Sequence, residues 1–232
     1  SNYLEQNKKH FKADNIDATK KICSYLKTKN IKLFVYLSTI GVHDRNYLSF
    51  EKGKINEKSS MSAKSLYGKS KISSEKIVKS STLNCLIIRP SWIYGQNMSK
   101  KSYIRQLYEW SKQGKLFTKI NFPGRVTVCE INNFLNVLIK LSLKENRKYQ
   151  EYIIGDFTPL KFSDLFYIEE KNLKFKNLIK FIKYFSIFFP SKLRILLEDY
   201  LLCDLSRLHD EGFIIDNDII KTLKKYKKNN IW

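Results

Sequence analysis

A tyrosine and a lysine one helical turn apart are the residues of this chain best suited to acid–base chemistry. Tyr67 and Lys71 are four positions apart, so on a helix they share one face. An ammonium beside a phenol favours the phenolate and lowers the tyrosine pKa towards a useful range. Thr39 is a hydroxyl that could bind the same substrate oxygen. The three residues predict a proton relay between an alcohol and a carbonyl, with hydride supplied by a cofactor.

Two apolar strands and a crossover helix are needed to position this relay. Residues 33–37 form a short continuous apolar run that predicts a strand buried in a parallel sheet, with Thr39 just beyond its carboxyl end. Residues 84–89 repeat the pattern, and Pro90 ends it. Parallel strands require a crossover, and residues 63–81 have the length and the Lys and Glu content of a connecting helix.

The tyrosine–lysine spacing alone is weak evidence, because the chain is rich in both residues. Only Tyr67 and Lys71 lie between a strand that ends in hydroxyls and a strand that ends in Arg-Pro. We interpret the other pairs with this spacing as solvated helix faces. They are Tyr25/Lys29, Tyr108/Lys112 and Tyr167/Lys171.

Motifs along most of the chain resemble the extended short-chain dehydrogenase/reductase superfamily, in its NAD-dependent nucleotide-sugar epimerase/dehydratase branch. The segment Tyr67-x-x-x-Lys71, followed by Glu75, resembles the active-site helix of the family. Thr39 stands three residues before Val42, which is also the family's spacing. The other similar segments are Asn15–Thr19, Val35–Val42, Ile88–Gly95, Val126–Glu130, Tyr152–Asp156 and a late segment from Cys203 to Phe213.

The resemblance implies an α/β fold, a partial Rossmann-type doubly wound parallel sheet with a small, mostly helical C-terminal substrate lobe. The expected division places the Rossmann-type portion in residues 1–160 and the lobe in residues 161–232. The implied activity is an NAD(P)-dependent epimerase, dehydratase or ketoreductase acting on a nucleotide-linked sugar, hence an isomerase or oxidoreductase. Two alternatives stay open, a dehydrogenase of the same superfamily on an apolar hydroxy or keto substrate and a catalytically silent interaction module.

The resemblance also assigns roles to individual residues. Thr39, Tyr67 and Lys71 are the expected catalytic residues. Substrate contacts are expected from Trp92 and Arg125. The expected contacts to NAD or NADP come from Asn15, Tyr67, Lys71, Pro90 and Ser91.

Simpler structural roles compete with two of these assignments, and with a substrate contact from His43. Asn15 could equally be the N-cap of a helix over residues 15–29, with residues 1–14 as a loop or frayed turn. Arg125 could clamp a diphosphate with its guanidinium or be an ordinary surface arginine. His43, in the loop after the first strand, is expected to be exposed rather than to touch substrate.

The chain departs from the family pattern in its glycines. None of its eight glycines forms a Gly-x-x-Gly-x-x-Gly fingerprint, the turn that holds a dinucleotide diphosphate at a helix N-terminus. We therefore expect a fragment of a longer enzyme that alone is inactive and binds dinucleotide weakly. The alternative that stays open is a homologue that has lost its cofactor site. Trp92, where the family commonly has Asn, and Glu130, where it has Asp, leave the substrate unspecified.

Composition limits the partners. The net charge of +21 comes mostly from lysines spread along the chain, which favours a solvated surface over nucleic-acid binding. Four scattered cysteines predict a reduced, cytoplasmic chain without a metal site. No apolar run is long enough to span a membrane. A homodimer stays open, as does peripheral contact of a basic, aromatic helix at 174–189 with an anionic membrane.

Overall fold

The computed structural model describes residues 8–44, 53–144, 149–167, 195–215 and 218–228. The chain divides into two compact units, each built from segments that are distant in sequence. The first contains residues 1–91, 134–155 and 203–213, and the second contains residues 92–133, 156–202 and 214–232. The domain boundary expected between residues 160 and 161 stays a prediction, and the proposed membrane helix at 174–189 lies outside the described residues.

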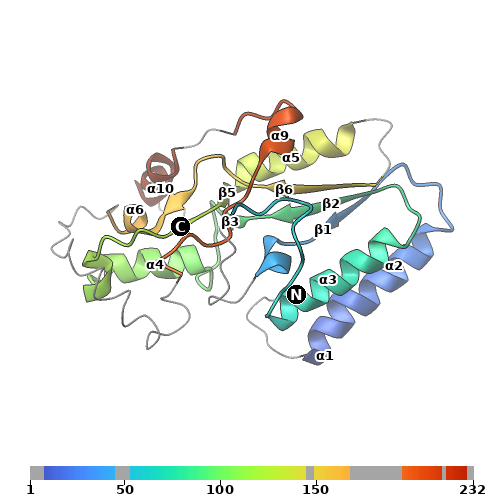
Figure 1. Cartoon of the computed structure of the whole chain (residues 1–232), viewed down its shortest axis with the longest axis horizontal. Helices are drawn as coiled ribbons and strands as arrows, with labels where there is room; N and C mark the ends of the chain where they lie inside the picture. The colour runs from blue at the N-terminus through green and yellow to red at the C-terminus, as the bar shows by residue number, and fades with distance from the viewer. Residues whose placement is uncertain (1–7, 45–52, 145–148, 168–194, 216–217, 229–232) are drawn as a thin grey trace. The chain divides into compact units, whose positions relative to one another are not determined.

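A parallel sheet of three strands forms the centre of the first unit (Figure 1). The strand order is β1-β2-β6, and both pairings are parallel. The apolar runs predicted as strands are therefore strands, and the predicted α/β class with parallel strands is confirmed. The strands are β1 (Phe34–Leu37), β2 (Cys85–Pro90) and β6 (Gln150–Ile154).

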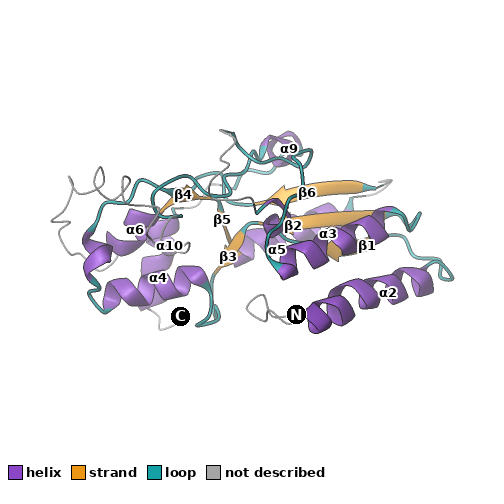
Figure 2. Ribbon diagram, turned by 60° about the horizontal axis from the view of Figure 1, so that its bottom comes forward, coloured by secondary structure: helices purple, strands orange, loops and turns teal. Residues whose placement is uncertain are grey.

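Helices α2 and α3 run side by side along the sheet (Figure 2). Their packing buries Cys23 and Val78 against Tyr36, Cys85 and Ile87 of the strands. The helix predicted from residue 15 begins earlier, so the expectation of a loop up to residue 14 is wrong for residues 8–14. The bounds are α1 (Lys8–Phe11), the π-helix η1 (Lys12–Asp17), α2 (Ala18–Leu26) and α3 (Leu66–Lys79).

Three further elements lie wholly or mostly in the described part of the first unit. The helix η2 follows β1, and Figure 1 shows α5 on the side of β2 and β6 that faces away from α2 and α3. Helix α5 begins in the second unit, and most of its length belongs to the first. The elements are η2 (Ile40–His43), α5 (Ile131–Leu143) and α9 (Ser206–Asp210).

The described part of the second unit contains two small strand pairs and several helices. β3 and β5 pair in parallel, and β4 and β7 pair antiparallel. Helix α4 ends two residues before Gly114, whose φ of +68° lies in the left-handed region that glycine adopts readily. The elements are β3 (Trp92–Tyr94), α4 (Tyr103–Lys112), η3 (Leu116–Lys119), β4 (Arg125–Val126), β5 (Val128–Glu130), β7 (Leu160–Lys161), α6 (Phe162–Tyr167) and α10 (Ile219–Lys228).

Cysteines lie inside both units as small apolar residues. Cys23, Cys85, Cys129 and Cys203 are all buried and carry free thiols. Burial raises the pKa of the Cys85 thiol to about 11, so this side chain is not a reactive thiolate at neutral pH. Cys85 in β2 and Cys129 in β5 are 1% and 0% exposed, so both fill the core beside their strands.

Candidate functional site

Thr39 caps the short helix that follows β1. Its backbone is extended, and its Oγ1 accepts a hydrogen bond from the amide of Gly41 at 3.1 Å. The side chain is half-buried. Because the capping bond uses Oγ1 as an acceptor, the hydroxyl proton of Thr39 is still available to donate. Thr39 is therefore a fixed hydroxyl at the carboxyl end of β1.

The first turn of α3 lies against η2. Ser65 is the N-cap, and its Oγ accepts the amide of Gly68 at 3.0 Å. A Cβ on Gly68 would lie 2.7 Å from the carbonyl oxygen of Gly41 and 2.5 Å from the Cβ of Ala63, so only glycine fits this approach. The contact brings the helix turn that carries Tyr67 to the loop that carries Thr39.

Tyr67 lies half-buried between an aromatic ring and an ammonium. The ring of Phe11 is 5.9 Å away between centroids, and Nζ of Lys71 lies 5.9 Å from the centroid of the Tyr67 ring. The predicted tyrosine and lysine are thus together on one face of α3. The ammonium acts on the phenol through space at this distance.

Lys71 is held by the end of β1. Its Nζ donates to the carbonyl oxygen of Leu37 at 2.8 Å and lies 4.9 Å from the centroid of the Tyr36 ring. Burial holds the pKa of Lys71 below its ordinary value, while the carboxylate of Glu75 acts in the opposite direction. The site therefore contains a cation that is poorly solvated and fixed by one carbonyl.

Asn15 links the π-helix η1 to α3. Its Nδ2 donates to Oγ of Ser70 at 2.8 Å, and this hydroxyl donates to the carbonyl oxygen of Tyr67 at 2.7 Å. Ser74 donates in turn to the carbonyl oxygen of Asn15 at 3.0 Å. The alternative that Asn15 is an N-cap is wrong, because the residue lies inside a continuous helical segment. Single π-turns are frequent at functional sites, and here the turn aims Asn15 at the helix that carries Tyr67.

A buried ion pair underlies the site, and sequence reasoning did not predict it. Nε and Nη2 of Arg89 donate to the two carboxylate oxygens of Glu75 at 2.9 and 2.6 Å, and Ser38 donates to the same carboxylate at 2.6 Å. Arg89 is 1% exposed and Glu75 is 0% exposed. The pair therefore joins the middle of α3 to the ends of β1 and β2, which positions Tyr67 and Lys71 relative to Thr39.

The ion pair continues to β6 through a second carboxylate. Glu151 contacts Nη2 of Arg89 and accepts a hydrogen bond from Lys79 at 2.8 Å. Burial alone would raise the pKa of Glu151, but hydrogen bonds from Lys79 and Tyr149 and the charge of Arg89 hold it below the ordinary value. Glu151 therefore stays ionised and balances the guanidinium.

Pro90 and Ser91 end β2 at the same edge of the sheet. The amide of Ser91 donates to the carbonyl oxygen of Ile154 at 2.9 Å, which fixes the backbone. The Oγ of Ser91 is buried and has no hydrogen-bond partner within the described part of the chain. A buried hydroxyl without a partner is costly, so this atom is suited to a polar ligand group.

His43 is buried, and its predicted exposure is wrong. The side chain is 0% exposed, and its Nδ1 lies 3.0 Å from the carbonyl oxygen of Ser60. The loop before α3 covers it, since the amide of Ser62 also donates to the carbonyl oxygen of Val42. This histidine therefore anchors that loop.

The two predicted substrate residues lie in the second unit. Trp92 packs edge-on against Tyr103 and Tyr200, with centroids 5.2 and 5.7 Å away. Arg125 is exposed and binds Asp199 with two hydrogen bonds, 3.0 Å from Nε and 2.6 Å from Nη2. The fork of the guanidinium is thus already filled by a carboxylate.

A second buried polar cluster, also missed from the sequence, lies at the start of α5. Asp156 accepts hydrogen bonds from Tyr94 at 3.2 Å and Asn133 at 3.2 Å, while Glu130 accepts the amides of Asn132 and Asn133. Burial, with a contribution from Glu130, raises the pKa of Asp156 to about 6. Tyr226 of α10 donates to Glu130 as well, so the cluster connects helices distant in sequence.

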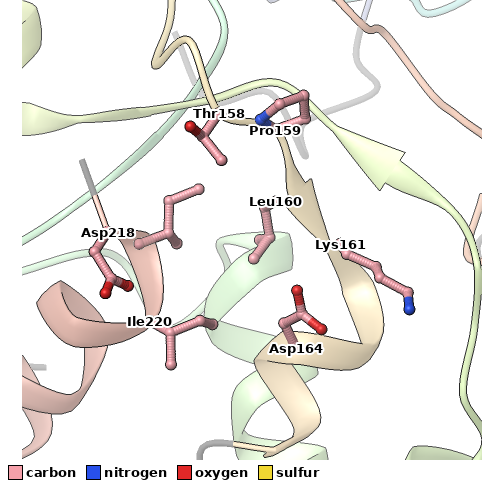
Figure 3. A pocket seen from close by; sticks show the side chains of 8 residues that line it. Thr158, Pro159, Leu160, Lys161, Asp164, Asp218 and Ile220 are labelled. Atoms are coloured by element: carbon pink, nitrogen blue, oxygen red, sulfur yellow. The ribbon is translucent and has the colours of Figure 1, made fainter. Parts of the chain in front are cut away.

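A cavity of about 430 Å³ lies within the second unit, and none of the predicted catalytic, cofactor or substrate residues lines it. It is bounded by β7, the start of α6 and the start of α10. Figure 3 shows Asp164 and Asp218 on either side of the apolar Leu160 and Ile220. Asp218 is engaged with the amide of Lys221, so this carboxylate already caps α10.

Two properties of the described residues bear on other classes of function. No helix among them has both the length and the apolar character needed to cross a membrane. No group of three or more metal-ligating side chains occurs among the same residues.

Comparisons with known proteins add a family and a fold. The family model described as RmlD substrate binding domain matches residues 2–121. No curated protein sequence matches the chain. The resemblance to the extended short-chain dehydrogenase/reductase superfamily is therefore supported by a sequence model as well as by the parallel sheet.

Solved structures with the same fold are considerably longer than this chain. The enzyme WbmG of Bordetella bronchiseptica, solved with NAD and UDP, superposes with a TM-score of 0.72 at 16% identity, over 100% of this chain and 72% of that one. dTDP-glucose 4,6-dehydratase of Bacillus anthracis, solved with NAD, has a TM-score of 0.70 at 17% identity, over 99% of this chain and 72% of that one. UDP-glucuronic acid 4-epimerase of Bacillus cereus, also solved with NAD, has a TM-score of 0.69 at 18% identity, over 90% of this chain and 63% of that one.

Proposed function

Because the chain belongs to the RmlD substrate-binding domain family, we propose that it forms part of an NAD(P)-dependent enzyme that acts on a nucleotide-linked sugar. The reaction class is epimerisation, dehydration or ketone reduction. One observation carries the proposal: Lys71 lies beside the Tyr67 ring on a helix whose first turn contacts the loop that holds Thr39. Enzymes in solved structures of the same fold bind NAD and UDP.

The proposed proton transfer uses the phenol of Tyr67. During oxidation of the sugar, the Tyr67 oxygen takes the proton of the reacting hydroxyl, and during reduction it returns a proton to the carbonyl oxygen. The nearby Lys71 ammonium stabilises the phenolate, and Thr39 donates its free hydroxyl proton to the same substrate oxygen. Tyr67, Lys71 and Thr39 are the catalytic residues of this proposal.

Residues of the first unit fit the nicotinamide half of a dinucleotide. Lys71 offers an ammonium to ribose hydroxyls, Asn15 fixes the helix turn, and the buried Oγ of Ser91 after Pro90 offers an unused polar atom. When bound, the cofactor supplies hydride exchange with the sugar carbon. The sequence contains no glycine-rich turn for the diphosphate half, so binding by these residues alone should be weak.

Substrate binding is proposed for Trp92 and Arg125. A sugar ring can stack on the indole, and a diphosphate can take the place of Asp199 on the Arg125 guanidinium. The exposed position of the Arg125–Asp199 pair makes this exchange inexpensive, since exposed ion pairs contribute about 0–1 kcal/mol.

A second candidate is a dehydrogenase of the same superfamily that acts on an apolar hydroxy or keto compound. The aromatic packing around Trp92 favours it, because Tyr103, Phe162 and Tyr200 surround the indole with apolar surface. Comparing binding of UDP with binding of an apolar ketone discriminates the two, since UDP needs Arg125 and the ketone does not.

Saturation-transfer NMR with NADH tests the proposed function directly. We expect transfer from the protein to the nicotinamide protons, with little transfer to the adenine protons and an affinity weaker than micromolar. Lys71→Met should abolish the transfer, whereas Lys76→Met, an exposed change on the same helix, should leave it unchanged. Submicromolar binding, or transfer centred on adenine, contradicts the proposed site, and the absence of any transfer favours the silent module.

Three further proposals concern location and assembly. Four buried free thiols fit a reducing compartment, so we propose the cytoplasm. Homodimerisation and membrane contact through residues 174–189 stay proposals that rest on the sequence. Light scattering across a dilution series tests the first, and flotation with anionic vesicles tests the second.

A further inference from the structure

Tyr36 of β1 lies against the ammonium of Lys71. The Nζ atom of Lys71 is 4.9 Å from the centroid of the Tyr36 ring, which is nearer than the 5.9 Å that separates it from the centroid of the Tyr67 ring. A cation within about 6 Å of the face of an aromatic ring is attracted by the negative charge of that face. The ammonium therefore contacts two rings, of which only Tyr67 belongs to the proposed proton relay.

The next residue of β1 supplies a second contact to the same ammonium. The carbonyl oxygen of Leu37 accepts a hydrogen bond from Nζ of Lys71 at 2.8 Å. Because side chains alternate between the two faces of a sheet, the Tyr36 ring points towards α2 and α3, while the Leu37 side chain points to the other face. The end of one strand thus holds Lys71 at two points, by a ring and by a backbone carbonyl.

Packing in the core fixes the position of the Tyr36 ring. The side chain is 8% exposed and belongs to the cluster that contains Cys23 of α2 and Val78 of α3. The ring of Phe34, two residues earlier in β1, lies 6.5 Å away between centroids. Burial also raises the pKa of the Tyr36 phenol, so the ring stays neutral and acts on Lys71 through its face rather than as a phenolate.

Few other groups stabilise the charge of Lys71 at short range. Burial lowers the pKa of Lys71, and the carboxylate of Glu75 raises it. Both oxygens of that carboxylate are bound by Arg89, so much of its field at Lys71 is cancelled. Within the described part of the chain, Lys71 has no hydrogen bond or ion pair to a side chain. The Leu37 carbonyl and the two ring faces are therefore its nearest stabilising groups.

We propose that Tyr36 is a positioning residue of the candidate site, because its ring face keeps Lys71 charged and holds the ammonium beside Tyr67. This inference rests on the proposed function, in which that ammonium stabilises the Tyr67 phenolate and binds ribose hydroxyls. Tyr36 is buried beneath α2 and α3, so it acts on the relay only through Lys71.

The proposal makes the site sensitive to pH in a defined direction. Weakening the Tyr36 ring face lowers the pKa of Lys71 further, because the burial remains while one stabilising group is lost. The neutral amine cannot stabilise a phenolate, so nicotinamide contact should disappear at a lower pH. The titratable groups that face the ammonium are Tyr36 from β1 and Tyr67 and Glu75 from α3, with Arg89 of β2 behind Glu75.

Fluorination tests the ring face with little change of shape. Tyr36→Phe removes the hydroxyl and keeps the ring, whereas trifluorophenylalanine at position 36 also withdraws negative charge from the ring face. NMR of the full chain with lysines carrying ¹³C at Cε measures the Lys71 pKa, and Lys71→Met identifies the resonance. We expect Tyr36→Phe to keep the native pKa. The trifluorinated ring should lower it, with at least about a threefold rise in the acid dissociation constant.

Val78→Ala is the matched control for loosening of the core. Val78 is 0% exposed in the same cluster as Tyr36, and its truncation leaves every aromatic ring in place. The urea midpoint of Val78→Ala should fall while the Lys71 pKa stays at its native value. Tyr36→Leu, which removes both packing and ring, should lower the urea midpoint and the Lys71 pKa together.

Three results overturn the proposal. They are an unchanged Lys71 pKa with the trifluorinated ring, an equal fall of that pKa in Val78→Ala, and nicotinamide contact whose pH dependence does not respond to the trifluorinated ring. Saturation-transfer NMR with NADH over a pH series measures the last. A lowered Lys71 pKa without any nicotinamide transfer in the native chain supports the hold of Tyr36 on Lys71 and contradicts the proposed function.

Discussion

Arg89 and Glu75 form a two-point ion pair that is sealed from solvent. Nε and Nη2 of the guanidinium contact the two carboxylate oxygens at 2.9 and 2.6 Å, and neither side chain is more than 1% exposed. The pair joins the end of β2 to the middle of α3, one turn after Lys71. The geometry of the candidate site therefore depends on charges that do not themselves touch the site.

Breaking this pair should destabilise the chain strongly. Arg89→Leu leaves the Glu75 carboxylate buried with Ser38 as its hydrogen-bond donor, and a stranded buried charge typically costs about 3–5 kcal/mol. The double variant Glu75→Leu with Arg89→Leu removes both charges, so its free energy of unfolding should fall much less. Urea unfolding monitored by tryptophan fluorescence measures both free energies.

Lys79→Ala is the control for that experiment. The Lys79–Glu151 pair is partly exposed, with 33% of the lysine side chain accessible, so its loss should cost within about 1 kcal/mol. A double variant as unstable as Arg89→Leu would show that shape rather than charge holds α3 in place.

The elements around this pair were predictable from the sequence, whereas the pair itself was not. Continuous apolar runs identified β1 and β2, and their parallel pairing required a crossover helix where α3 lies. Glu75 and Arg89 were visible only as members of motifs, because their contact depends on how a helix packs on a strand. A charged residue inside an otherwise apolar strand was the one local signal, since buried arginine requires a partner.

Local patterns failed for the same reason at Asn15 and His43. A helical N-cap and an exposed loop residue are reasonable interpretations when only neighbours in sequence are considered. The observed hydrogen bond from Asn15 spans 55 residues, and that of His43 spans 17. Both residues are positioned by tertiary contacts, which no periodicity in the sequence reports.

The pKa of Lys71 should respond to Glu75. Burial lowers the Lys71 pKa and Glu75 raises it, so Glu75→Gln should lower it further. NMR titration of the chain with ¹³C-methylated lysines measures the shift. A Lys71 pKa at the ordinary lysine value in the native chain would contradict the burial described here, and an unchanged value in Glu75→Gln would remove Glu75 as its electrostatic partner.

Stability should depend on pH through Asp156. Its pKa is raised from 3.8 to about 6 in the folded chain, so the folded state binds this proton more tightly than the unfolded state does. The stabilisation that this proton gives the folded state is fully present below pH 3.8 and is lost as the pH rises through about 6. The loss amounts to about 3 kcal/mol in the free energy of unfolding. The free energy of unfolding of Asp156→Asn, relative to the native chain, should therefore increase across this interval.

Tyr94→Phe provides the control for Asp156. The hydrogen bond from Tyr94 lowers the Asp156 pKa, so its removal should shift the pH-dependent loss of stability to higher pH. If the difference in the free energy of unfolding between the native chain and Asp156→Asn were independent of pH, the ionisation of Asp156 would not be coupled to folding.

Gly68→Ala should separate α3 from η2. The added Cβ would lie 2.5 Å from the Cβ of Ala63 and 2.7 Å from the carbonyl oxygen of Gly41, and neither neighbour can rotate away. Overpacking of this kind costs about 1–3 kcal/mol, even though alanine favours helices more than glycine does. Gly53→Ala is the matched control, because nothing lies within 4 Å of a Cβ at that position. Urea unfolding and NADH saturation-transfer NMR should show lower stability and weaker nicotinamide contact in Gly68→Ala alone. Equal behaviour of the two variants would mean that the close approach of α3 to the Thr39 loop does not shape the site.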